Sequence, residues 1–308
     1  MKIIAVDSEM RRIPMVLAWI VIASATMPSP SHAVVTHNRL ATNRLATNRL
    51  ATNRLATNRL ATNRLATNAL TSGALNADPS ADELLSTPEG RDLYSYVVSC
   101  ALPAGTDIQA AVPGAPDTDP QSNTTYSCTS EQCVFSGGIG LVPRWLGHKL
   151  SRKGQEWISA CLLARVNAHD VVEAISMRGK HPALAVGPSE PFDFPLEEGS
   201  FYGNVFIPDP DPIDWHACRG QDQAAGENGG LVSRDCAEPD PSDATLTQCG
   251  FNYAGDCADY TPVVPSAYAC KKYDTFTAHG SCHADPGLGT WPHAKTYKQV
   301  ITTFVRLD

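Results

Sequence analysis

Two segments of the chain place apolar residues at the spacing of an amphipathic α-helix. The first covers residues 88–102, where Thr87 is a favoured N-cap and Pro88 a favoured first-turn residue. Its apolar positions are Leu93, Tyr96, Val97 and Cys100. The second covers residues 152–169 and follows Ser151, another favoured N-cap. Each pattern predicts a helix with one buried face.

Later segments are rich in β-branched and aromatic residues and alternate in part between apolar and polar positions, which is typical of half-buried strands. They are residues 170–179, 200–207, 275–282 and 297–308. Residues 208–265 are rich in Pro, Asp and Gly and carry four cysteines, which favours long disulfide-stapled loops over a sheet. The predicted class is α+β, with two early helices and an antiparallel sheet.

The N-terminus has the order of a secretory signal peptide. Arg11 and Arg12 precede an apolar run over residues 13–27, and Ser31 and Ala33 are small residues at a cleavage-site spacing. The run has about 15 residues, fewer than the roughly 20 that span a bilayer as a helix. An N-terminal membrane anchor is the alternative. Residues 1–33 are therefore predicted to be a signal peptide, and the mature chain an exported protein of the periplasm, cell surface or extracellular space, not integral to a membrane.

Ten cysteines follow, and none belongs to a Cys-x-x-Cys pair of the kind that binds zinc or supports redox chemistry. An even number of cysteines in an exported protein predicts disulfides. Connectivity does not follow from sequence, but short closures and the two helices favour one set. The set is Cys100–Cys161, Cys128–Cys133, Cys218–Cys236, Cys249–Cys257 and Cys270–Cys282.

Charge is divided unevenly along the chain. Residues 34–76 contain six Arg and no acidic residue, whereas residues 77–308 contain 15 Lys plus Arg against 30 Asp plus Glu. An acidic domain of this composition repels nucleic acid and anionic lipid, so no nucleic-acid partner is expected. We therefore divide the chain into a basic tract (34–76) and a disulfide-rich α+β domain (77–308). The tract is the part suited to an anionic envelope or polysaccharide.

The basic tract is an array in which the unit Asn-Arg-Leu-Ala-Thr occurs six times over residues 38–67. A five-residue step rotates a helical residue by roughly 140°, so the leucines form no apolar stripe, and in a strand successive leucines point to opposite faces. The array resembles the pentapeptide-repeat family, which implies a four-sided β-coil with each Leu inside; here Arg, rather than Asp or Asn, precedes the Leu. A flexible basic linker is the alternative.

The whole layout also resembles exported bacterial proteins of uncharacterised function, in which an Asn-x-Leu array precedes a cysteine-rich domain. The segments that carry this resemblance are TPEGRDLYSYVVSCALP, WISACLLARVNAH, EEGSFYGNVF and CGFNYAGDCADY. They span most of residues 87–270. The resemblance implies no activity.

Two groups of residues are candidates for chemistry. Asp209, Asp211 and Asp214 lie close together in a Pro-rich stretch, and carboxylates at this spacing can bind calcium, the candidate cofactor, although Pro/Asp turns have the same composition. His279, His283 and Asp285 can form a catalytic base beside a hydroxyl or bind a metal. Their spacing matches neither a zinc helix nor a serine-hydrolase elbow, so an exposed loop is the alternative.

These observations favour an exported, surface-associated binding protein on a basic tether over an enzyme. The alternative is an exported hydrolase that uses the His/Asp group or a calcium-assisted acidic loop.

Overall fold

The computed structural model describes residues 35–37, 40–41, 66, 69–76, 79–112, 126–167, 174–207, 214–224, 236–258, 269–274, 278–284 and 295–306. All of them belong to one compact unit, Ser31–Asp308. The segment predicted to be a signal peptide lies outside the described residues. Within the described ranges, no helix is both long and apolar enough to cross a bilayer.

Helix α5 (Pro88–Ala101) confirms the first helical pattern. Thr87 is its N-cap, since Thr87 Oγ1 accepts a hydrogen bond from the N–H of Gly90 at 3.1 Å. Two shorter helices, α3 (Ser72–Asn76) and α4 (Pro79–Leu85), precede it on either side of the predicted boundary at residue 77.

A glycine-rich segment caps the C-terminal end of α5. Helix ends leave carbonyls without partners, and here N–H groups of the segment donate to four of them over 2.7–3.0 Å. The donors are Gly138, Ile139, Leu141 and Val142, and the acceptors Leu102, Ser99, Cys100 and Ala101, respectively. A Cβ at Gly137 would lie 2.3 Å from the carbonyl oxygen of Pro103. The glycine there therefore permits a close backbone approach.

Helix α6 (Arg152–Ala164) confirms the second pattern, and Ser151 Oγ caps it by accepting from the N–H of Gly154 at 3.2 Å. The helix ends earlier than predicted, because Val166–Asn167 forms strand β6 and pairs with β2 (Leu40–Ala41). A disulfide between Cys100 and Cys161 joins α5 to α6.

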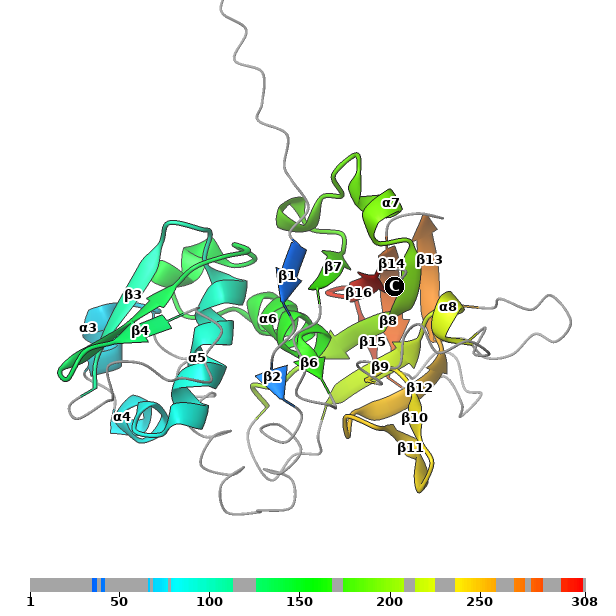
Figure 1. The fold of residues 1–308 in the computed structure, drawn as a ribbon. Helices are drawn as coiled ribbons and strands as arrows, with labels where there is room; N and C mark the ends of the chain where they lie inside the picture. Colours follow the sequence, from blue (N-terminus) through cyan, green and yellow to red (C-terminus); the bar gives the residue numbers. More distant parts are fainter. Residues whose placement is uncertain are drawn as a thin grey trace, which may run out of the picture. The chain divides into compact units, whose positions relative to one another are not determined.

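A three-stranded antiparallel sheet packs against α5, as Figure 1 shows. Its order is β3 (Asp107–Ala111), β5 (Gln132–Ser136) and β4 (Tyr126–Cys128). The rings of Tyr94 on α5 and Phe135 on β5 meet edge to face, with centroids 4.7 Å apart. Aromatic pairs of this geometry stabilise an interface beyond the area that they bury.

The main sheet has eight described strands, and β9 and β12 are its one parallel pair in the described residues. The strands are, in spatial order, β1 (Val35–His37), β7 (Ala174–Arg178), β16 (Ile301–Val305), β8 (Leu196–Gly203), β9 (Trp215–Arg219), β12 (Asn252–Asp256), β11 (Asp243–Thr247) and β10 (Pro239–Asp240). Three predicted strands overlap β7, β8 and β16. The prediction that residues 208–265 form loops is wrong for β9–β12, whose Ala, Gly and Asp residues carry little strand propensity and are held by pairing with their neighbours.

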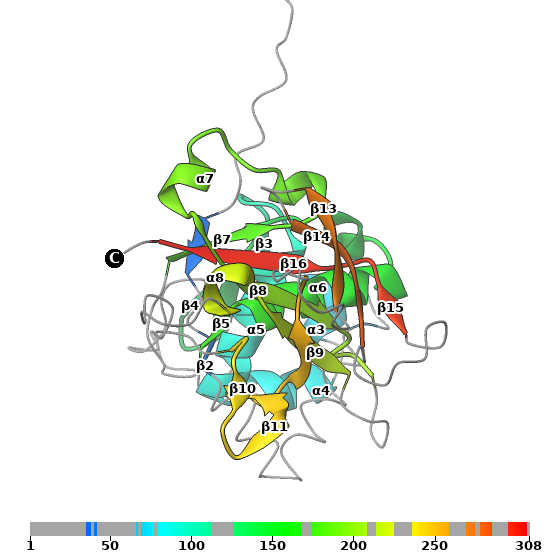
Figure 2. The same cartoon turned by 90° about the vertical axis from the view of Figure 1, so that its right-hand side faces the viewer.

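The two faces of the main sheet are covered by different elements. Helix α6 packs on one face, where Ile158 shares a core with Met177, Phe201 and Ile301. The other face meets a second three-stranded antiparallel sheet, whose order is β13 (Cys270–Asp274), β14 (Ala278–His283) and β15 (Thr296–Tyr297). In Figure 2, β13 and β14 run across the direction of β16. The fourth predicted strand overlaps β14, and the α+β class with disulfide-stapled loops is confirmed.

Short helical turns complete the described elements. They are η1 (Pro143–Leu146), η2 (Pro182–Leu184), α7 (Glu190–Asp193) and α8 (Gln221–Ala224).

The repeat tract is joined to the fold at both ends. Its start supplies β1 and β2, which pair with β7 and β6. Near its end, Ala66 and Leu70 are 2% and 1% exposed and belong to the core. Leu70 N–H donates to the carbonyl of Trp145 at 2.8 Å, and the carbonyl of Ala66 accepts from Leu150 N–H at 2.9 Å. The boundary predicted at residue 77 therefore does not separate two compact units; residues 42–65 lie outside the described residues.

All ten cysteines form disulfides. The pairs Cys100–Cys161, Cys128–Cys133 and Cys270–Cys282 are as predicted. The predicted pairs Cys218–Cys236 and Cys249–Cys257 are wrong, because the structure joins Cys218 to Cys257 and Cys236 to Cys249. The parallel pairing of β9 with β12 brings Cys218 next to a cysteine 39 residues away. Closing such a loop costs little more than closing a short one, so sequence distance is a weak guide.

Candidate functional site

The densest group of reactive side chains surrounds Asp214, directly before β9. Its Oδ1 accepts from His216 Nε2 at 3.1 Å and also from the Tyr297 hydroxyl, while Oδ2 accepts from Lys295. Asp214 and His216 are two residues apart at the start of a strand, and Lys295 and Tyr297 have the same spacing at β15. Because alternate residues of a strand share a face, each pair points the same way. Two strand starts thus meet at one carboxylate.

Aromatic rings surround this carboxylate. Tyr202 and His216 are paired residues of β8 and β9, and their rings stack with centroids 5.5 Å apart and planes 13° apart. The ring of Tyr297 lies 5.7 Å from that of His216 and 5.6 Å from that of Tyr202. The Tyr202 hydroxyl donates to the carbonyl of His283 at 2.8 Å. The site is therefore a carboxylate enclosed by three rings and one cationic side chain.

The contacts fix the charge state of the group. Burial opposes ionisation of Asp214, but hydrogen bonds from His216, Lys295 and Tyr297 outweigh it and hold the pKa of Asp214 below its ordinary value. Burial, followed by the hydrogen bond to Asp214, raises the pKa of Tyr297. The site therefore presents an ionised carboxylate and a protonated phenol near neutral pH.

His216 can act as a base in this arrangement. If Nε2 donates to Asp214, Nδ1 carries the lone pair, and Nδ1 is buried without a hydrogen-bond partner among the described atoms. A carboxylate that orients an imidazole in this way is a recurring arrangement for general-base catalysis. Within the same described part of the chain, no hydroxyl or thiol is bonded to that nitrogen.

A second polar group lies on the same face of the main sheet. His279 on β14 places Nε2 2.9 Å from Oε1 of Glu197 on β8. The N–H of His279 donates to Thr302 Oγ1 at 2.9 Å, and Ser200 Oγ lies 2.8 Å from that same oxygen. His279 is only 2% exposed. The group therefore docks β14 on the sheet.

A third group anchors the segment around α7. Arg178 Nε donates to Ser176 Oγ at 2.9 Å, and its Nη2 donates to the carbonyl of Phe194 at 2.7 Å. Nε also lies 3.9 Å from Oε1 of Glu190. Burial lowers the pKa of Arg178, although Glu190 and Glu197 counteract it. A buried, multiply bonded arginine of this kind positions backbone.

The predicted catalytic residues are not assembled into one group by the described structure. His279 and His283 lie four residues apart on one strand, a separation of roughly 13 Å. His279 bonds to Glu197, whereas His283 Nδ1 lies 3.1 Å from Thr296 Oγ1. Burial, followed by the charge of Lys271, lowers the pKa of His283. Asp285 lies outside the described residues.

Of the three predicted calcium ligands, the structure describes Asp214 alone. Asp209 and Asp211 lie outside the described residues, and both oxygens of Asp214 accept from protein donors, one of them the cationic Lys295. In the described ranges, one group of potential metal ligands converges, the sulfur atoms of Cys218, Cys270 and Cys282. All three belong to disulfides and so supply no thiolate.

Of this group, the sequence pattern indicated Asp214, as a calcium ligand, and did not point to His216 or Tyr297. The Asp-x-His spacing before a strand was the available signal. Tyr202 and Tyr297 come from β8 and β15, and only tertiary structure unites them with β9.

No family model matches the chain, and no curated protein or solved structure matches it significantly.

Proposed function

We propose that the chain is an exported binding protein, stabilised by disulfides, that attaches to an anionic envelope or polysaccharide through the Arg residues of its repeat tract. The tract carries six Arg and no acid, whereas residues 77–308 carry a net charge of −15. A polyanion therefore attracts the tract and repels the rest of the chain. The resemblance to exported bacterial proteins with the same layout belongs to this proposal.

The observation that carries the proposal is the attachment of the tract at both ends. Strand β1 pairs with β7 before the repeats, and Leu70 is buried in the core after them. The intervening arginines are thus tied to a disulfide-stabilised unit from two sides. Because these arginines lie on one segment held at both ends, the first contact of one of them with a polyanion raises the effective concentration of the others.

The test removes positive charge from the tract but keeps its length, because deletion of residues 34–76 would also remove β1 and Leu70. Arg44, Arg49, Arg54, Arg59 and Arg64 are changed together to Gln. Each Arg near an anionic surface contributes about 1 kcal/mol, so cosedimentation with phosphatidylglycerol vesicles or binding to alginate should weaken more than about tenfold.

The matched control changes five exposed cations elsewhere to Gln and should bind as the unaltered protein does. They are Arg144, Lys149, Lys153, Lys271 and Lys298. Equal binding by the repeat variant and the unaltered protein would overturn the proposal, as would an equal loss in the control.

A second candidate function, exported hydrolysis, is favoured by the Asp214–His216 contact of 3.1 Å. In this reading Asp214 orients the His216 imidazole, and His216 is the base that activates water. A screen of ester, phosphoester and glycoside substrates would precede the variant. His216→Asn should then reduce any activity found by about 10²–10⁴-fold.

His181→Asn is the matched control for that variant, because His181 caps η2 by accepting from the N–H of Ala183. The control should retain activity. Full activity in the His216 variant would exclude this site.

A further inference from the structure

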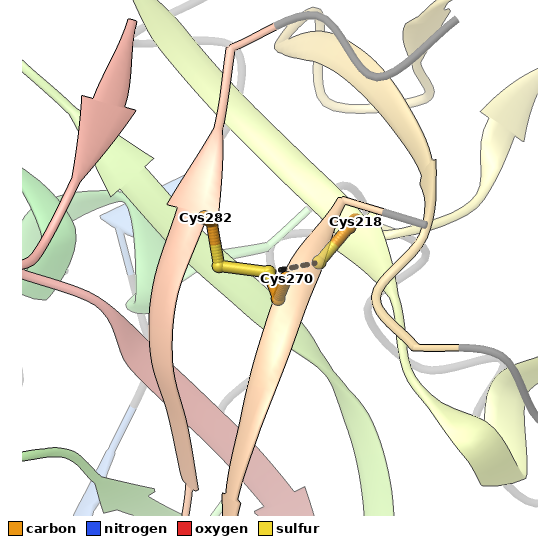
Figure 3. A group of neighbouring side chains, drawn as sticks. All are labelled: Cys218, Cys270 and Cys282. Atoms are coloured by element: carbon orange, nitrogen blue, oxygen red, sulfur yellow. Dashed lines mark hydrogen bonds between the residues drawn. A yellow bond between two sulfur atoms is a disulfide. The ribbon is translucent and has the colours of Figure 1, made fainter. Parts of the chain in front are cut away.

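Two disulfides touch where the β13–β15 sheet meets the main sheet. Cys218–Cys257 joins β9 to the residue after β12, and Cys270–Cys282 joins β13 to β14. The Sγ atoms of Cys218 and Cys270 lie 3.4 Å apart, and that of Cys282 lies within 4.8 Å of both (Figure 3). Because both atoms of the 3.4 Å approach are already in disulfides, neither carries a proton, and the approach is a direct sulfur–sulfur contact.

The backbone holds this contact in place. The N–H of Cys270 donates to the carbonyl of Cys257 at 2.7 Å, so the start of β13 lies against the end of β12. Cys270 and Cys282 are paired residues of β13 and β14. All four cysteines are at most 1% exposed. The sulfur atoms are therefore kept together and shielded from solvent.

We propose that Cys218, Cys257, Cys270 and Cys282 form a single thiol–disulfide exchange centre. Its central step is attack of a Cys270 thiolate on Cys218 Sγ. The Cys218–Cys270 bond forms, the Cys218–Cys257 bond breaks, and the electron pair leaves on Cys257 as a thiolate. One disulfide and one thiolate are present before and after the step, so it needs no oxidant or reductant.

An external thiolate can start the sequence. It attacks Cys282 Sγ, forms a mixed disulfide there, and releases the Cys270 thiolate, which then attacks Cys218. The external thiolate is consumed in the mixed disulfide at Cys282, and one new thiolate is formed at Cys257. Thiol–disulfide exchange depends on access and on which sulfur is attacked; burial limits the first step, whereas the 3.4 Å contact favours the second.

The full-length Cys282→Ser variant tests the central step without any added thiol, because it leaves Cys270 unpaired. The variant is purified near neutral pH, quenched in acid, denatured and alkylated with N-ethylmaleimide. Peptide mapping then locates the alkylated cysteine. We expect alkylated Cys257 together with a linked Cys218–Cys270 peptide. Alkylation of Cys270 alone, with Cys218–Cys257 intact, would overturn the proposal.

Two further variants guard against misfolding and against general disulfide scrambling. Cys257→Ser frees Cys218, whose attack on Cys270 should expel Cys282, so alkylated Cys282 is the expected readout from the opposite side. Cys133→Ser frees Cys128 on β4, and alkylation should remain at Cys128. If the control scrambles as widely as the other two, or if neither test variant exchanges, the four cysteines do not form an exchange centre.

Discussion

The two faces of the main sheet are held by different interactions. On the face under α6, Met177, Phe201 and Ile301 pack against the buried side of an amphipathic helix. A polar contact is also buried there, from Thr303 Oγ1 to Glu198 Oε2 at 2.7 Å. On the face under β14, Arg178 and Glu197 are buried with ionic or hydrogen-bonding partners. Apolar packing stabilises in rough proportion to buried area. Buried charges cost desolvation energy and stabilise only while each partner is present.

The two faces of the sheet therefore differ in how they tolerate substitution. An apolar face tolerates exchange of one hydrophobic residue for another of similar volume. On the polar face, β14 and the segment around α7 pack in one position, in which their hydrogen-bond donors and acceptors meet partners on the sheet. The Asp214 group and the touching disulfides both lie on this second side, so the reactive chemistry of the described fold is concentrated there.

The largest effect is expected from Arg178→Met, which keeps most of the volume but leaves Glu190 without its cationic neighbour. Breaking a buried pair costs about 3–5 kcal/mol, and urea unfolding should report a loss of this size. The double variant with Glu190→Gln should recover part of it. If the losses of the two single variants simply add in the double variant, the Arg178–Glu190 pair does not hold the polar face.

The double variant Cys100→Ala/Cys161→Ala tests the helix-covered side. The disulfide closes a separation of 61 residues, and its removal should lower the free energy of unfolding by about 2–4 kcal/mol. Cys128→Ala/Cys133→Ala is the control, since those residues are five apart. Short loops constrain the unfolded chain less, so the control should lose less stability.

Neighbouring positions of β16 compare the two faces directly. Thr302→Val removes the oxygen that accepts from the N–H of His279 and should cost about 1–3 kcal/mol, because a buried donor loses its partner. Ile301→Val, on the α6 face, should cost about 0.5–1.5 kcal/mol. Chemical denaturation measures both. A larger loss from Ile301→Val than from Thr302→Val would contradict the expectation that the polar face is the less tolerant of substitution.

A smaller effect is expected from pH. The pKa of His283 is lower in the folded state than its ordinary value, so below about pH 6.5 the unfolded chain binds the proton more readily. Stability should therefore fall as pH drops from neutrality, until the folded state also binds the proton. His283→Gln should flatten that slope in urea unfolding from pH 7 to 5. An unchanged slope would show that other groups set it.

The smallest effect is expected at the surface of α6. Arg152 Nε lies 3.1 Å from Glu156 Oε1 in an i,i+4 pair, and the Arg152 side chain is 62% exposed. Arg152→Ala should change the free energy of unfolding by about 0.3–0.5 kcal/mol. A loss comparable to that of Arg178→Met would contradict the view that burial, rather than charge, distinguishes the two pairs.

Local patterns predicted the elements whose signals lie within one segment. Thr87 and Ser151 cap their helices as predicted, because a cap involves only the next few residues. The strands β9–β12 were missed although three of their four pairings lie within residues 208–265, because a composition rich in Pro, Asp and Gly carries little strand signal. In the candidate site, Asp214 was predicted as a calcium ligand from its local Pro/Asp stretch, whereas its contacts with Lys295 and Tyr297 join segments far apart in the sequence.

The helix starts, the α+β class, the division of charge and the oxidised state of the ten cysteines were all readable from the sequence, since they depend on local composition, residue counts and spacing. Tertiary structure alone decided that Cys218 bonds to Cys257, that both ends of the repeat tract join the fold, and that one sheet face is polar. The reason is physical: strand pairing and disulfide exchange act between atoms that meet in space, and closing a longer loop adds little cost.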